Sequence, residues 1–306
     1  MIQRARVIKL LQRLIRIDSQ NPPGDEWEIG NAVKEYLKDL KIQTKIYVFK
    51  KRRLNVLGFI PGRSAQKSLL VTPHLDTVPA GTSWKVPPLK GVISGNRLYG
   101  LGATDCKVNL AVSLEVIRSL IEDKTTLAYS LVFAATADEE SGSDLGLIPL
   151  LEKNIIHPNA ALVLDADEFE IVVTQKGLMH CKVKIEGKRA HGAYPWQGVN
   201  AISIAMKILQ ELESRKSAYP HNRFLRPPTV NIGTIRGGDK VNVVADWCEF
   251  ELDFRFLPGM SAKKLLTELK RTIRKFSKKF SIEIEGIQEP YYIPESHNLV
   301  TTLSRA

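Results

Sequence analysis

A histidine and a carboxylate lie two residues apart at the end of an apolar stretch of this sequence. His74 and Asp76 follow Leu69–Thr72, a run of apolar and branched side chains that is typical of a buried strand. Because side chains alternate along a strand, both residues are expected to point to the same side. A carboxylate beside an imidazole fixes the tautomer that a metal-binding histidine needs. The pair therefore indicates a metal ligand.

More carboxylates follow other apolar or glycine-bounded segments. They are Asp105 after Gly102, the acidic run Asp138–Glu140 after residues 129–136, and Asp165 after residues 161–164. Each feature alone is a weak signal, because acidic loops are usually solvated. Several carboxylates brought together repel one another unless protons or cations intervene. Together with one imidazole they suit a divalent metal, for which zinc is the commonest choice.

Alternating helix and strand patterns must position these residues. The periodicity predicts helices 1–18 and 26–40, strands 43–49, 54–60 and 68–72, helix 107–121, strand 129–136, helix 145–152 and strand 161–164. Such alternation is typical of an α/β layer with helices on both faces of a sheet. Ligands of these sheets bind beyond the carboxyl ends of the strands. The polar clusters are all expected at that edge.

The pattern changes after about residue 177. It predicts strand 178–186, helix 199–214, strands 229–235 and 248–256, helix 262–276 and strand 281–285. The order β-α-β-β-α-β is that of the ferredoxin-like unit. We therefore expect a catalytic metal-binding domain of residues 1–176, to which 291–306 return, and a second domain of residues 177–290.

Composition and charge limit the classes of partner. The net charge of +11 permits either nucleic-acid binding or a solvated basic surface. We favour the solvated surface and expect no nucleic-acid partner, because the basic residues are scattered along predicted helices without interleaved aromatic side chains. No apolar run is long enough to span a bilayer, so no membrane partner is expected. Three widely separated cysteines argue against a disulfide framework, and we expect a cytoplasmic protein.

Taken in order, these motifs resemble those of a known family. The matching segments are Leu14–Gly24, His74–Asp76, Tyr99–Lys107 and Ala137–Ser143. They are similar to the zinc-dependent metallopeptidases and deacylases that include acetylornithine deacetylase, succinyl-diaminopimelate desuccinylase, aminoacylase-1 and carboxypeptidase G. The resemblance covers nearly the whole chain, and the order of the motifs is far more specific than any one of them.

The resemblance implies a site for two zinc ions, with cobalt or manganese as possible substitutes. It implies that His74 and Asp165 bind the first metal, that Asp105 bridges both, and that Glu140 binds the second. Asp165 is preferred over Asp167 because it directly follows the apolar run.

The same resemblance assigns the catalytic roles. Asp76 would orient His74, and Glu139 would be the general base that takes a proton from a metal-activated water and returns it to the leaving amine.

The second domain resembles the lid of this family, which also forms the dimer interface. The resemblance implies that His191 reaches the active site of the partner subunit and polarises the scissile carbonyl. Asn242 and Arg255 would grip the backbone or carboxylate of the substrate. For Arg255, an ion pair on the strand surface is an equally good interpretation. The implied assembly is a homodimer.

The sequence departs from the family at its end. Relatives continue beyond the lid and supply a final histidine to the second metal, whereas this sequence stops at Ala306 and His297 does not match that ligand. The expectation is therefore a catalytic domain that is truncated at its C-terminus. Its first metal site would be complete, and its second would keep only Asp105 and Glu140. Such a chain is either a fragment of a longer protein or a degenerate family member.

We thus expect an α/β fold, with a mostly parallel-sheet catalytic domain and an inserted ferredoxin-like lid and dimerisation domain. The predicted function is a metal-dependent hydrolase that cleaves the amide bond of N-acyl amino acids or small peptides. The alternative is a catalytically impaired or inactive homologue that acts at most as a binding module. The sequence leaves the acyl group, the amino acid and the metal open.

Overall fold

The computed structural model describes residues 1–165, 170–215 and 218–306, with only the backbone of Ala65. The chain divides into two units, Met1–Phe169 and Glu170–Ala306. Residues 291–306 fall within the second of these units. The domain boundaries inferred from the sequence, 1–176 with 291–306 and 177–290, stay a prediction.

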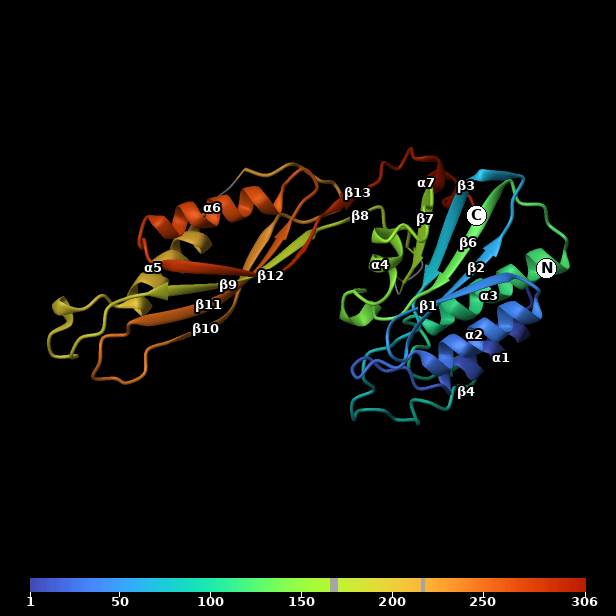
Figure 1. The fold of residues 1–306 in the computed structure, drawn as a ribbon, viewed down its shortest axis with the longest axis horizontal. Coiled ribbons are helices and arrows are strands. Elements are labelled where there is room, and N and C mark those ends of the chain that lie inside the picture. The colour runs from blue at the N-terminus through green and yellow to red at the C-terminus, as the bar shows by residue number, and fades with distance from the viewer. Residues whose placement is uncertain (166–169, 216–217) are drawn as a thin grey trace. The chain divides into compact units, whose positions relative to one another are not determined.

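A five-stranded sheet in the order β1-β2-β6-β3-β7 organises the first unit (Figure 1). The strands are β1 (Gln43–Lys50), β2 (Arg53–Ile60), β3 (Ser64–Pro73), β6 (Tyr129–Ala135) and β7 (Ala160–Leu164). β3 pairs in parallel with both β6 and β7, so the carboxyl ends of these three strands meet at one edge. His74, Glu139 and Asp165 follow β3, β6 and β7 respectively, and the fold therefore brings them to that edge.

The sheet is mixed, whereas the sequence predicted a mostly parallel one. β1 and β2 pair antiparallel, and so do β2 and β6. The prediction was wrong because a buried strand has the same apolar pattern in either kind of pairing. The connection between β1 and β2 carries the missing information, since only Lys51 and Arg52 join them. Two residues can close a hairpin, whereas a parallel crossover needs a dozen or more.

Helices cover both faces of this sheet, as predicted. α1 (Arg4–Ile15), α2 (Trp27–Asp39) and α3 (Lys107–Glu122) pack on one face, and α4 (Leu147–Glu152) packs on the other (Figure 1). The first face buries Leu14, Val33, Val56, Leu114 and Phe133, and the second buries Leu57, Leu70, Ala134 and Leu150. Neighbouring strand residues such as Val56 and Leu57 point to opposite faces because side chains alternate along a strand. Burial on both sides makes the sheet a firm base for the residues at its edge.

The second unit has the predicted β-α-β-β-α-β order. Its elements are β9 (Gly177–Glu186), α5 (Ala201–Ser214), β10 (Thr229–Gly237), β11 (Trp247–Phe256), α6 (Ala262–Arg274) and β12 (Phe280–Gln288). The four strands form an antiparallel sheet in the order β10-β11-β9-β12. α5 and α6 cover one face of it, where Phe250 and Ile273 are fully buried (Figure 1). The opposite face carries the charged residues of these strands.

Several short elements were not predicted from the sequence. They are the hairpin of β4 (Val92–Ser94) and β5 (Arg97–Tyr99), the 3-10 turns Glu139–Ser141 and Pro195–Gln197, the paired strands β8 (Thr174–Gln175) and β13 (Tyr291–Tyr292), and α7 (Asn298–Leu303). The elements of two or three residues are too short to show any periodicity, and α7 has only six residues. Within the described residues, no helix combines the length and the apolar character needed to cross a membrane.

The 3-10 turn Glu139–Ser141 is called the acidic turn below. Gly146 provides a test of the close packing behind it. A Cβ atom at this position would lie 1.9 Å from the carbonyl oxygen of Ala137, so the main chain must shift to accept it. We expect Gly146→Ala to lower the free energy of unfolding by about 1–3 kcal/mol, the usual cost of overpacking. Urea unfolding of the metal-free protein measures this. Gly286→Ala is the matched control, because its Cβ would meet no atom within 4 Å. Equal stabilities of the two variants would contradict the prediction.

Candidate metal centre

His74 lies directly after β3 and is buried, with 3% of its surface exposed. Its Nδ1 lies 3.0 Å from the main-chain oxygen of Asp76. Its Nε2 lies 2.9 Å from Oδ1 of Asp105, 3.9 Å from Oδ1 of Asp165 and 4.0 Å from Oε2 of Glu139. A carbonyl oxygen only accepts hydrogen bonds, so it keeps the proton of the neutral ring on Nδ1. Nε2 then presents its lone pair toward the carboxylates, as a metal ligand requires.

His74, Asp105 and Asp165 together can hold one metal ion. One ligand atom of each lies within 4.8 Å of those of the other two. The two aspartate side chains are 46% and 40% exposed, so the cluster opens to solvent on the carboxylate side. Three nitrogen and oxygen ligands with room for a further one are typical of catalytic zinc sites. The donors therefore fit zinc. The other aspartate considered from the sequence, Asp167, lies outside the described residues.

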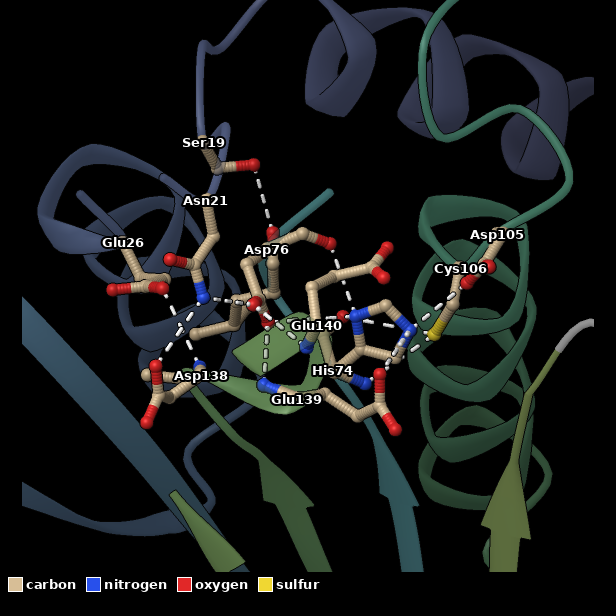
Figure 2. Close-up of polar contacts among 12 residues, drawn as sticks. Ser19, Asn21, Glu26, His74, Asp76, Asp105, Cys106, Asp138, Glu139 and Glu140 are labelled. Carbon is tan, nitrogen blue, oxygen red and sulfur yellow. Dashed lines mark hydrogen bonds and ion pairs between the residues drawn. The ribbon is translucent and has the colours of Figure 1, made fainter. Parts of the chain in front are cut away.

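Asp76 is fully buried, and its carboxylate holds the acidic turn (Figure 2). Its Oδ1 accepts a hydrogen bond from the main-chain N–H of Glu139, and its Oδ2 accepts one from that of Glu140, each at 3.1 Å. Oδ1 also lies 3.5 Å from Nδ1 of His74, farther than the main-chain oxygen of Asp76 itself. Asp76 thus contacts the imidazole mainly through its backbone, while its carboxylate faces the turn.

Hydrogen bonds keep the Asp76 carboxylate charged. Burial raises its pKa, but hydrogen bonds with His74, with Asn21 and with the N–H of Glu139 outweigh burial, and the resulting pKa is below the usual value. The charged carboxylate can accept the main-chain N–H of Glu139 on one oxygen and that of Glu140 on the other.

Glu139 and Glu140 begin the 3-10 turn after β6. Oε1 of Glu140 accepts a hydrogen bond of 3.1 Å from the N–H of Val78. Burial raises the pKa of Glu139 to about 6, with the charges of Asp165 and Glu140 acting in the same direction and that of His74 against it. A carboxyl group with a pKa near 6 can accept a proton at neutral pH and give it back, which suits a general base.

The cluster carries too much negative charge for its single imidazole. Burial lowers the pKa of His74, but its hydrogen bonds with Asp105, Asp165 and Asp76 outweigh burial and raise it. The pKa of Glu140 is raised as well, by burial and by the charge of Asp105. Both shifts mean that the carboxylates draw protons into the site. A divalent cation at this position would neutralise the same charge.

In the second unit, the structure brings His191 and Asn242 onto adjacent segments. The N–H of Gly192 donates a hydrogen bond of 2.8 Å to the main-chain oxygen of Asn242, and His191 forms a β-bridge with Val243. Nδ1 of His191 accepts a hydrogen bond of 3.0 Å from the N–H of Ala193. The side chain of His191 is exposed.

Arg255 lies elsewhere in the same unit. The N–H of Gly187 donates a hydrogen bond to the main-chain oxygen of Asp246, so the segment that leads to His191 lies beside the beginning of β11. Arg255 lies near the other end of β11. Its Nε donates hydrogen bonds of 2.9 and 3.2 Å to the two carboxylate oxygens of Asp253. The structure does not bring Arg255 to His191, and its contact is the strand-surface ion pair that the sequence left open.

Sequence reasoning gave no individual role to four buried polar residues behind the acidic turn, and it singled out only Asp138 among them, as part of the acidic run 138–140. They are Asn21, Glu26, Arg53 and Asp138, each no more than 5% exposed. A weak signal existed in Arg53, a charged residue at the start of an otherwise apolar strand. Asn21 lay in the segment Leu14–Gly24, which carried part of the family resemblance but was given no role of its own. Their partners come from distant parts of the sequence, so no local pattern connects them.

Two family models match parts of this chain. Residues 173–281 match the peptidase dimerisation domain, and residues 55–148 match peptidase family M28. Among characterised relatives, the acetylornithine deacetylase of Aliivibrio salmonicida (strain LFI1238) is 31% identical over 293 residues, which are 91% of this chain and 76% of the relative. The acetylornithine deacetylase of Aliivibrio fischeri (strain ATCC 700601 / ES114) is 30% identical over 293 residues, with the same coverage of 91% and 76%.

Solved structures share the fold. The aminopeptidase PepT from Bacillus cereus superposes with a TM-score of 0.78 at 23% identity, over 99% of this chain and 81% of that one. An M20 family metallo-carboxypeptidase from Sulfolobus solfataricus gives a TM-score of 0.73 at 21% identity, over 96% and 81%. A Bacillus subtilis protein described as a dinuclear metal binding peptidase from the M20 family gives 0.68 at 15% identity, over 94% and 74%.

His74 is the ligand whose removal should cost most metal affinity. Loss of a residue that only hydrogen-bonds to a metal ligand costs roughly 10–100-fold in metal affinity. His74 is itself a proposed ligand, so we expect His74→Ala to weaken Zn²⁺ binding by more than that. Titration of the metal-free protein measures the affinity, and the zinc-dependent rise of the thermal midpoint checks it independently. His180→Ala is the control, because that side chain instead lies 3.4 Å from Asp253 on the second unit. Equal zinc affinities of the two variants would show that His74 is not a ligand.

Proposed function

The chain belongs to the M20 peptidase family, and on that basis we propose that it is a metal-dependent hydrolase of the amide bond in N-acyl amino acids or small peptides. One observation carries this proposal. The ligand atoms of His74, Asp105 and Asp165 lie within 4.8 Å of one another, and Oε2 of Glu139 lies 4.0 Å from Nε2 of His74. A three-ligand group beside a carboxylate with a raised pKa is the arrangement that metal-assisted hydrolysis uses.

The residues of the chain divide the work of such a reaction. His74, Asp105 and Asp165 would hold the metal, which when bound supplies Lewis-acid polarisation of the amide and a lowered pKa of water. Glu139 would take a proton from the attacking water and give it to the leaving amine. In the metal-free site, burial raises the pKa of this carboxyl to about 6. Asp76 would hold the turn from which Glu139 projects.

We propose two adjacent metal sites that share Asp105, with zinc as the metal and cobalt or manganese as substitutes. The Bacillus subtilis protein of similar fold is a dinuclear metal binding peptidase, which supports this number. Glu140 would bind the second metal, and its Oε1 already accepts the N–H of Val78. Within the part of the chain that the structure describes, one group of three ligands is found, and it belongs to the first site.

For the second unit we propose the roles of lid and dimer interface. The match of residues 173–281 to the peptidase dimerisation domain supports them. His191 would polarise the scissile carbonyl in the partner subunit, and Asn242, on the adjacent segment, would bind the substrate backbone. Arg255 would bind the substrate carboxylate only if that carboxylate replaces Asp253, its present partner.

We also propose a cytoplasmic location. The three cysteines are buried and unpaired, which agrees with it.

Glu139 is the residue that tests the reaction. We expect Glu139→Gln to lower kcat for N-acetyl amino acids by roughly 10²–10⁴-fold, the contribution of a general base, while zinc stays bound. Steady-state kinetics and metal analysis of the same sample measure both. Glu152→Gln, an exposed position on α4, is the matched control and should leave kcat unchanged. Retained turnover in the Glu139 variant would refute the assignment.

The metal content separates the enzyme from a second candidate function, an inactive homologue that binds at most one metal. This candidate is considered because the residues that the structure describes contain one group of three metal ligands. We expect two equivalents of zinc per chain after dialysis, together with hydrolysis of N-acetyl amino acids. Atomic absorption and an amine-release assay give the two values. At most one equivalent without hydrolysis would establish the inactive homologue instead.

A further inference from the structure

A buried ionic cluster lies behind the acidic turn, outside the groups assigned to metal or substrate. Arg53 is 5% exposed, Glu26 is 0% exposed and Asp138 is 5% exposed. Nε of Arg53 donates a hydrogen bond of 2.6 Å to Oε2 of Glu26, and its second terminal nitrogen donates one of 2.7 Å to Oδ1 of Asp138. The planar guanidinium thus joins two carboxylates from different segments, which a lysine ammonium on a flexible stem cannot do in the same geometry.

Asp138 has an unusual main-chain conformation that this cluster holds in place. Its φ of 68° and ψ of 21° lie in the left-handed region, which is uncommon for a residue with a side chain. Oδ2 of Asp138 accepts a hydrogen bond of 3.0 Å from the N–H of Leu145, and its main-chain oxygen accepts one of 2.6 Å from the N–H of Ser143. Such conformations persist where the surroundings determine them from several sides, and they are common at functional sites. The residue that follows is Glu139.

Asn21 connects this cluster to Asp76 (Figure 2). Its Nδ2 donates hydrogen bonds of 2.9 Å to Oδ2 of Asp76 and 3.2 Å to Oδ1 of Asp138. Asp76 in turn accepts the main-chain N–H groups of Glu139 and Glu140. Two routes of hydrogen bonds therefore lead to the acidic turn, one through Asp138 and one through Asn21 and Asp76.

We propose that Arg53 is a positioning residue that fixes the main chain of Glu139 and Glu140 through Asp138 and Asn21. Without the guanidinium, the buried carboxylates of Glu26 and Asp138 would lose the cation between them and repel each other. The turn would then leave the conformation in which Asp76 accepts both N–H groups. The importance of this for catalysis rests on the proposed function, whereas the effect on the main chain does not.

Amide hydrogen exchange in the metal-free protein tests the effect on the main chain. We expect Arg53→Met to speed exchange at Glu139 and Glu140 by on the order of tenfold, because the turn would open locally more often. The matched control is Arg52→Met. Arg52 is the preceding residue and forms a comparable ion pair, with Nε 2.6 Å from Oδ2 of Asp25, but both side chains are largely exposed. The control should leave exchange at the turn unchanged.

Kinetics of the zinc-loaded protein test the consequence for catalysis. A base displaced by about 1 Å can cost roughly 100-fold, so kcat of Arg53→Met should fall by about that factor. KM should change little, because Arg53 touches no substrate group. Arg53→Lys keeps the charge but not the two-pronged geometry, and its kcat should lie between those of the wild type and Arg53→Met.

Two results would overturn the proposal. One is wild-type exchange at Glu139 and Glu140 in a folded Arg53→Met protein, and the other is equal acceleration in Arg52→Met. If Arg53→Met does not fold, Arg53→Lys replaces it, since this variant keeps a cation between Glu26 and Asp138 but loses the planar group that joins both, and wild-type exchange at the turn in Arg53→Lys would then overturn the proposal. Absence of turnover in the wild type would refute the proposed hydrolase and would leave the exchange comparison to decide the role of Arg53.

Discussion

Mutual repulsion among the carboxylates around His74 is the constraint on which the first unit depends. Asp105, Asp165 and Glu139 lie within 4.0 Å of a single Nε2 atom, and Asp76 is buried on the other side of the ring. Like charges at such distances raise one another's pKa unless a cation intervenes. In the metal-free site, burial raises the pKa of Glu139 and the charges of Asp165 and Glu140 add to that rise, while hydrogen bonds with the carboxylates raise the pKa of His74. A site with this charge is suited to bind a divalent cation.

The acidic turn has the buried cation Arg53 on one side and the proposed metal site on the other. On the solvent side, the open carboxylates of Asp105 and Asp165 leave room for a metal. On the buried side, Arg53 forms ion pairs with Glu26 and Asp138, and none of the three side chains is more than 7% exposed. A buried cation with two carboxylate partners keeps them in place, because removing one member leaves an uncompensated charge. The turn that carries Glu139 thus lies between the fixed charge of Arg53 and the carboxylates of the proposed metal site.

The sequence predicted the parts of this arrangement that are local. Apolar runs ending in His74, Asp138 and Asp165 are visible as patterns, and the structure brings their ends to one edge. The β-α-β-β-α-β order of the second unit was equally visible. What could not be predicted depends on pairing between distant segments. The carboxylate of Asp76 turns toward two main-chain amides rather than mainly toward the imidazole, and Arg53 joins Glu26 to Asp138. No spacing in the sequence specifies either contact.

The mixed sheet and the buried arginine have a common cause. Since β2 runs antiparallel to β6, the beginning of β2 lies beside the end of β6, where Val56 pairs with Ala135. Arg53, at the start of β2, therefore lies close enough to donate a hydrogen bond to Asp138, which follows β6. A parallel strand would have placed its first residue at the opposite edge of the sheet, far from the acidic turn. The hairpin between β1 and β2 therefore does more than complete the sheet. It delivers a cation to the edge where the parallel strands deliver only carboxylates and one imidazole, and so makes that concentration of negative charge compatible with a folded core.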